Sequence, residues 1–164
     1  MGRLSRAELT VPTSTKQDEL GAVRMGPFGR QFRYIFAKKK IPKFRVVGNR
    51  NVLPTAAGVG WSGGISAAVN LSACPLGVAF VQISASQYGY IMSRGPLGNL
   101  GELSVYAITD GGVAAGDSLV KDESSAVGRF DTATNTGTQA AWIMGKAQAA
   151  DSGSYLAAGI INAW

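Results

Sequence analysis

The sequence has no histidine and a single cysteine, Cys74. Histidine is the side chain that most often acts as a general acid or base near neutral pH and as a metal ligand, so its absence excludes the commonest catalytic and metal-binding arrangements. A single cysteine excludes an internal disulfide and any metal site built from several cysteines. Cys74 lies in the apolar stretch LSACPL with no lysine or arginine beside it, which indicates an unreactive thiol.

Charged residues and long apolar runs are also scarce. Asp, Glu, Lys and Arg make up 16% of the chain, against about 25% in an average soluble domain. No apolar run approaches the roughly 20 residues of a membrane-spanning helix, and the basic opening MGRLSRAELT lacks the apolar centre of a secretory signal. With 164 residues, of which 46% are hydrophobic, we expect one folded domain in a soluble protein made inside the cell.

Carboxylates are missing from a long central part of the chain, since none lies between Glu19 and Glu102. Residues 1–50 contain 12 lysines and arginines but 3 acids, whereas residues 51–164 contain 4 and 7. The basic segment from Arg24 to Arg50 therefore has no acidic neighbour within it. An acidic protein surface and a nucleic acid are the two partners that such a segment attracts, and a solvated face without a partner is the alternative.

Motifs for cofactor binding are incomplete. The stretch GVGWSG at residues 58–63 has the G-x-G-x-x-G spacing of dinucleotide-binding loops, but no helical pattern follows it and no acid lies about 20 residues later. The only Gly-Lys pair, Gly145-Lys146, is followed by Ala147 instead of the serine or threonine of a phosphate-binding loop. We expect a flexible loop at residues 58–63 and no cofactor.

Five carboxylates between residues 110 and 131 could in principle form a catalytic pair or a calcium site. Most of them stand beside glycine or serine, where aspartate bonds to the backbone of its own turn, and the calcium-loop pattern is absent. We therefore interpret them as turn residues and predict no metal site and no enzymatic activity. The five are Asp110, Asp117, Asp122, Glu123 and Asp131.

The pattern of turns and alternating residues predicts an all-β fold. Residues 1–20 contain Pro12 and the run TVPTST, which is typical of an extended arm. In residues 21–164, which we expect to form a single β-domain, turn signals recur about every 10 residues and no long amphipathic helix is indicated. Around Gly26-Pro27-Phe28-Gly29 two extended runs form a predicted hairpin, and the second alternates aromatic residues with Arg33 on the opposite face. We predict a compact β-barrel or β-sandwich.

Several stretches of the chain resemble one family of viral structural proteins. These stretches are GRQFRYIFA, PLGVAFVQISASQYGYIMSRGP, TDGGVAAGDSLV and GKAQAADSGSYLAAGIINAW. In composition and strand order they resemble the head decoration, or cement, proteins of tailed bacteriophages. The resemblance carries no catalytic signature.

The resemblance implies a compact β-domain on the outer surface of an expanded icosahedral head, made in the cytoplasm of a bacterial host. It implies that the chain binds the major capsid protein, bridges neighbouring capsid subunits and associates with itself as a homotrimer, with no membrane contact. Many identical sites on a lattice make modest individual affinities sufficient.

We expect the basic residues of the first third of the chain to make the capsid contacts. Two of them lie in the predicted arm across adjacent subunits, and the others face acidic patches of the shell. Two tryptophans are expected to be anchors, packed in the body or at a subunit boundary. The predicted contacts are Arg3, Arg6, Arg24, Arg30, Arg33, Lys38, Lys39, Lys40 and Lys43, and the predicted anchors are Trp61 and Trp164.

Other functions remain open from the sequence. The resemblance to virion structural proteins also fits a minor capsid, head-completion or tail component. The run RQFRYIFAKKKIPKFR also fits a nucleic-acid-binding β-barrel, but we do not expect this partner because strand alternation places the aromatics opposite Arg33. An enzyme or a lectin-like module using the acidic turns is the remaining alternative.

Overall fold

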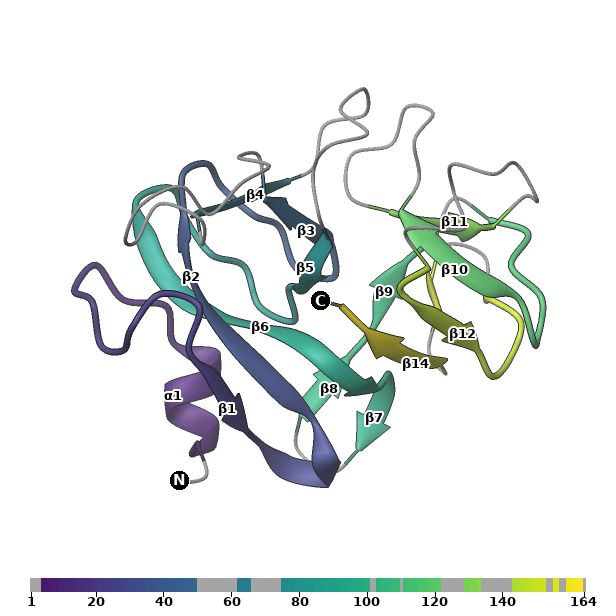
Figure 1. The fold of residues 1–164 in the computed structure, drawn as a ribbon, viewed down its shortest axis with the longest axis horizontal. Coiled ribbons are helices and arrows are strands. Elements are labelled where there is room, and N and C mark those ends of the chain that lie inside the picture. The colour runs from purple at the N-terminus through teal and green to yellow at the C-terminus, as the bar shows by residue number, and fades with distance from the viewer. Residues whose placement is uncertain are drawn as a thin grey trace.

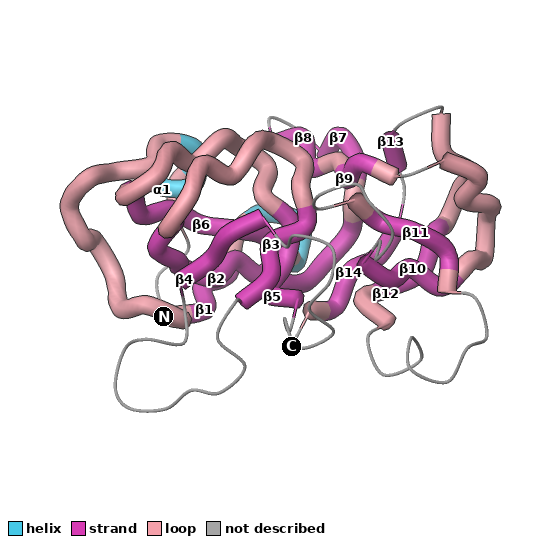
Figure 2. Tube along the Cα trace, turned by 90° about the horizontal axis from the view of Figure 1, so that it is seen from above, coloured by secondary structure: helices cyan, strands magenta, loops and turns pink. Residues whose placement is uncertain are grey.

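The computed structural model describes residues 4–49, 62–65, 75–100, 103–109, 111–121, 129–133, 143–152, 155–156 and 159–163. Strands dominate these segments, and helix is confined to α1 (Arg6–Thr10) and the short 3-10 turn η1 (Pro27–Gly29). Figure 1 shows the arrangement of the strands, and Figure 2 shows how little of these described segments is helical. The sheets are antiparallel apart from one parallel pairing, so the prediction of an all-β fold is confirmed.

Most of the strands belong to one sheet of ten. Its order is β1-β2-β4-β3-β5-β6-β14-β12-β10-β11, and two small sheets pair β13 with β9 and β7 with β8. The strands are β1 (Val23–Met25), β2 (Gln31–Ala37), β3 (Val46–Asn49), β4 (Ser62–Ile65), β5 (Pro75–Val78), β6 (Gln87–Pro96), β7 (Gly98–Leu100), β8 (Leu103–Val105), β9 (Ala107–Ile108), β10 (Ser118–Lys121), β11 (Phe130–Thr132), β12 (Gly145–Ala147), β13 (Tyr155–Leu156) and β14 (Gly159–Asn162).

The long strand β6 connects the two groups of strands that Figure 1 shows. It pairs with β2 from Ala37↔Gln87 to Gln31↔Arg94, and its far end pairs with β14. Five ladders form a closed path from β2 back to β2. The path runs from β2 to β4, β3, β5 and β6, and the β2–β6 ladder closes it. This circuit comes nearest to the predicted barrel, although its β5–β6 step is the single residue pair Val78↔Met92.

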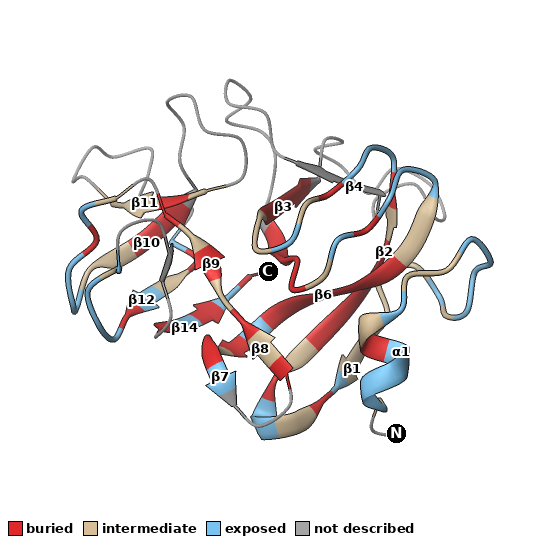
Figure 3. Ribbon diagram, turned by 180° about the vertical axis from the view of Figure 1, so that it is seen from behind, coloured by how far each residue is buried: buried red, intermediate tan, exposed pale blue. Residues whose placement is uncertain are grey.

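Both faces of β2 are buried because two hydrophobic clusters flank it. Phe32 and Tyr34 belong to the larger cluster, whereas Ile35 and Ala37 on the other face belong to the smaller one. The prediction that the aromatic face enters the core is therefore confirmed for Phe32 and Tyr34. Figure 3 shows how far burial extends along β2 and β6.

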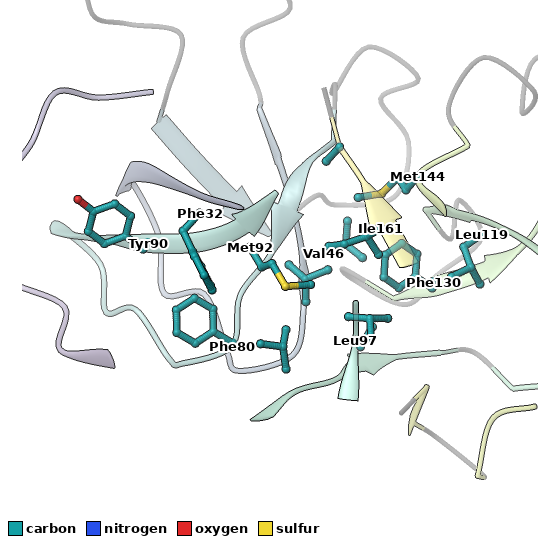
Figure 4. Packing of buried hydrophobic residues seen from close by; sticks show 14 of the residues in the cluster. Phe32, Val46, Phe80, Tyr90, Met92, Leu97, Leu119, Phe130, Met144 and Ile161 are labelled. Atoms are coloured by element: carbon teal, nitrogen blue, oxygen red, sulfur yellow. The ribbon is translucent and has the colours of Figure 1, made fainter. Parts of the chain in front are cut away.

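The larger cluster runs through both groups of strands. Phe32 meets Phe80 edge to face, with ring centroids 5.2 Å apart. Met92 continues the cluster toward Ile161 and Phe130 on the β10–β14 side (Figure 4). Burial of this continuous apolar surface stabilises the two groups of strands together.

The described part of the N-terminal segment is folded against the body, which corrects the prediction of an extended arm. Ser5 caps α1 in a capping box, because its hydroxyl accepts from the Glu8 N–H while its own N–H donates to the Glu8 carboxylate. Leu9 is 1% exposed and joins the larger cluster. Thr13 and Tyr88 exchange two backbone hydrogen bonds of 2.9 and 2.8 Å. Within the described segments, no helix has the length and apolar character needed to cross a membrane.

Candidate functional site

Four exposed lysines project from the turn that follows β2. We call Lys38, Lys39, Lys40 and Lys43 the lysine turn, and all four side chains are exposed. The turn is fixed to the body because Ile41, fully buried, exchanges backbone hydrogen bonds of 2.8 and 2.9 Å with Ile83. The four charges are therefore presented from an anchored backbone.

Aromatic rings adjoin the lysine turn. The ammonium of Lys43 lies 4.5 Å from the centroid of the Phe44 ring, a cation–π contact. The Phe44 ring meets Tyr106 edge to face at 5.2 Å. Both rings are half-buried. The sequence pattern gives no sign of this group, because Tyr106 comes from a distant part of the chain.

Arg24 is paired within the chain. Its guanidinium forms a two-pronged salt bridge with Asp18, with Nε and Nη2 donating over 2.8 and 2.7 Å. The Tyr90 hydroxyl donates to the same carboxylate over 2.8 Å. The bonds from Arg24, with those from Tyr90 and the Glu19 N–H, lower the pKa of Asp18 to about 2. An acid six residues upstream thus neutralises the first cation of the basic segment, which we expected to find its counter-charge elsewhere.

Arg30 is fully buried, so the prediction that it contacts another molecule is wrong. Its Nε, Nη1 and Nη2 donate to the carbonyl oxygens of Pro96, Leu103 and Gly98 over 2.9, 2.6 and 2.8 Å. Burial lowers the pKa of this guanidinium from its ordinary value. Arg33 is also buried, at 9% exposure, because the smaller cluster and its surroundings cover the face opposite the aromatic side chains.

Of the remaining predicted residues, most lie outside the part of the chain that the structure describes. Arg6 is exposed on α1. Arg3, Trp61, Cys74 and Trp164 lie outside the described residues, as do Asp110, Asp122, Glu123 and the first four positions of the 58–63 loop.

Two of the five acidic residues are described, and both bond to nearby backbone. Asp117 follows a turn, as predicted, whereas Asp131 lies in strand β11, so its interpretation as a turn residue is wrong. Asp117 accepts from the Ala114 N–H over 2.7 Å. Asp131 accepts from the Thr132 N–H over 2.7 Å. Among the described residues, no group of three or more potential metal ligands is found.

An open pocket of about 700 Å³ lies between α1, the following segment and strands β2 and β6. We call it the tyrosine pocket, because the Tyr34, Tyr88 and Tyr90 rings line it. The Tyr34 ring lies 6.0 Å from Tyr88 in a stacked arrangement and 4.9 Å from Tyr90 in a tilted one. The other lining residues are Leu4, Ala7, Glu8, Val11, Thr13, Gln17, Asp18, Arg24 and Gly89.

The sequence does not reveal the tyrosine pocket, although one signal for a wall of it is present. The Ser5-x-x-Glu8 spacing indicates that a helix starts at α1. The spacing does not indicate that this helix packs over β6. Burial and the bond to Asp18 raise the pKa of the Tyr90 hydroxyl, so it stays protonated and acts as a donor at neutral pH. The pocket thus combines aromatic rings with fixed polar groups.

Comparison of the chain with protein-family models finds no match. Comparisons with curated proteins and with solved structures also find none.

Proposed function

We propose that this chain is a viral structural protein, a decoration protein that binds the outer surface of a tailed-phage head and stabilises neighbouring major capsid subunits. In this proposal it assembles as a homotrimer and acts by adhesion. The observation that carries the proposal is the lysine turn. It presents four exposed ammonium groups from an anchored backbone, and none of the four has a carboxylate partner within the described residues.

Weak ion pairs between the lysine turn and a capsid subunit are sufficient for attachment to a lattice of many identical subunits. One exposed ion pair contributes about 0.2–1 kcal/mol, so a few lysines against an acidic patch give a weak contact. A protein that engages several capsid subunits at once gains effective concentration, and weak contacts then add up to stable attachment.

Loss of the lysine turn should weaken attachment. The triple variant Lys38→Ala, Lys39→Ala, Lys40→Ala should bind expanded heads lacking the native protein about tenfold more weakly, because three ion pairs of about 0.5 kcal/mol disappear. Copies bound per head, counted by quantitative gel analysis across a concentration series, measure the change.

The matched control is the double variant Lys16→Ala, Lys146→Ala, which removes exposed lysines outside the turn. It should bind as the unaltered protein does. Equal occupancy for the triple variant and the control would overturn the proposed role of the turn, and failure of the unaltered chain to bind heads at all would overturn the proposed function.

A nucleic-acid-binding protein is the second candidate, and the rings beside the lysine turn favour it. Phe44 and Tyr106 stand next to Lys43, which brings aromatic and basic groups together at the surface as single-strand binding requires. A gel-shift titration with single-stranded DNA and RNA at physiological salt separates the two candidates. Submicromolar binding that the triple variant loses would favour nucleic acid over the capsid surface.

A further inference from the structure

We propose that the tyrosine pocket is a binding site for a neutral saccharide, a pyranose ring or a short chain of them. This inference is independent of the lysine turn and of the proposed function. The pocket volume of about 700 Å³ lies within the range of small-molecule sites in proteins. The choice of ligand follows from which polar groups of the pocket are still available for bonding.

All acceptor positions of the Asp18 carboxylate are occupied by donors of the protein itself. Its Oδ1 accepts from the Glu19 N–H and from Nη2 of Arg24, and its Oδ2 accepts from Nε of Arg24 and from the Tyr90 hydroxyl. A carboxylate offers about four acceptor positions, so none is left for a ligand. Asp18 is therefore a positioning residue that holds Arg24 and Tyr90 in the pocket wall.

Three other groups keep bonding capacity that the described residues do not use. Both hydrogen bonds from Ser5 to Glu8 end on Oε2, at 2.8 and 2.6 Å, so Oε1 remains an acceptor. Gln17 donates its backbone N–H to the Tyr34 hydroxyl, and its exposed side-chain amide has no bond within the described residues. Nη1 of Arg24 is likewise a donor beside the two nitrogens that bind Asp18.

The apolar part of the lining faces the same space. Leu4, Ala7 and Val11 contribute one side, and Val11 is 60% exposed although its side chain is purely hydrophobic. Of the tyrosine rings, that of Tyr88 is half-buried, whereas those of Tyr34 and Tyr90 are 2% and 6% exposed, so a ligand would cover mainly Tyr88. A pyranose presents apolar C–H faces and a rim of hydroxyls that donate and accept, which matches rings and alkyl groups combined with separate donors and acceptors.

The charges disfavour ionic ligands. The Arg24 charge is balanced by Asp18, but its guanidinium still faces the pocket and repels a cation. The Glu8 carboxylate repels an anion, and the capping bonds from Ser5 lower its pKa so that it stays ionised. A neutral ligand with many hydroxyls meets neither repulsion.

The test is a titration of the full chain, labelled with ¹⁵N, followed by amide chemical shifts. The probes are glucose, galactose, mannose and N-acetylglucosamine, with arginine and inorganic phosphate as charged probes. At least one sugar should shift the amides of Glu8, Gln17 and Gly89 with a dissociation constant in the millimolar range. Arginine and phosphate should leave these amides unshifted.

Two variants remove the proposed sugar contacts while keeping the local fold. Glu8→Gln retains the capping box, and Gln17→Ala retains the backbone bond to Tyr34. Gln17→Ala removes one hydrogen bond to the ligand, and Glu8→Gln replaces a charged acceptor with a neutral amide donor, so each should weaken sugar binding about fivefold or more. The matched controls Glu19→Gln and Lys16→Ala alter exposed neighbours outside the lining and should bind normally.

Three results would overturn the inference. They are the absence of shifts with every sugar, sugar binding that Glu8→Gln and Gln17→Ala leave unchanged, and shifts at the pocket amides with arginine or phosphate alone. Head binding by the same variants is a separate measurement, so failure of the saccharide site leaves the decoration proposal standing.

Discussion

At the scale of single residues, arginines with similar surroundings in the sequence have opposite roles. Arg30 bonds to three backbone carbonyls and fixes the junction of β6, β7 and β8, whereas Arg24 pairs with a carboxylate at the rim of a pocket. The sequence places both in one basic segment. Their different roles depend on carbonyls and acids that only the folded chain brings within reach.

The Asp18 cluster should make stability depend on pH in the acid range. The pKa of Asp18 is lowered to about 2 from 3.8, so its charged form stabilises the folded state. This contribution is complete above pH 3.8 and is lost as the pH falls toward 2. Solvent screens part of the interaction, so we expect a loss of about 1 kcal/mol.

Chemical unfolding from neutral pH down to the acid limit measures this effect. Asp18→Asn should have a lower free energy of unfolding at neutral pH. It should also lack the part of the acid-induced loss of stability that comes from protonation of Asp18. Glu19→Gln, a change at an exposed neighbour, should follow the unaltered protein. A pH profile of Asp18→Asn that parallels that of the unaltered protein would contradict the assignment.

At the scale of elements, α1 forms within a segment whose sequence pattern indicates an extended arm. Pro12 and the run TVPTST suggest an extended arm, but the capping box ahead of them starts a helix. A helix of five residues has little stability alone. Its persistence depends on burial of Leu9 and on the Thr13–Tyr88 bonds, which are tertiary contacts.

Removal of the buried side chain of α1 should release the N-terminal segment. Leu9→Ala should lower the free energy of unfolding by about 2–5 kcal/mol, because it empties a site in the larger cluster. Limited proteolysis should then cut within residues 4–22 before the body unfolds. The control Val11→Ala, at a position that is 60% exposed, should change stability little. Equal stability of the two variants would show that the segment contributes nothing to the core.

At the scale of the whole molecule, charge divides along the chain. Residues 1–100 contain 13 lysines and arginines and 3 acids, whereas residues 101–164 contain 3 and 7. The described strands β1–β6 belong to the first part and β10–β12 to the second, and Figure 1 shows them in different groups. Among the described residues of the second part, three acids balance three basic residues, so the excess positive charge belongs to the β1–β6 side.

Binding through the basic side should weaken as salt rises. The Debye length shortens from about 10 Å at 0.1 M to about 3 Å at 1 M, so exposed ion pairs lose most of their attraction. Occupancy on heads should decline over this range for the unaltered protein and much less for the Lys38–Lys40 triple variant. A salt-independent occupancy would indicate an apolar contact and contradict the role of the lysines.

The fold class could be predicted from the sequence because it depends on local signals. Alternation along β2, glycine at turns and the scarcity of amphipathic helix all indicate strands. The tyrosine pocket could not be predicted, since Asp18 and Tyr90 are 72 residues apart and meet because β2 pairs both with β1, which carries Arg24, and with β6, which carries Tyr90. The exposure of the lysine turn was predictable, whereas the burial of Arg30 was not.

The length of β6 has a mechanical consequence. Its backbone is bonded to β2 along most of its course and to β14 at its far end, so a load that pulls the two groups of strands apart along β6 shears both ladders. Many hydrogen bonds resist such a load together, whereas strands that open from one end lose them singly. If a partner held this protein through both groups of strands, β6 would act between them as a stiff spacer and not as a hinge.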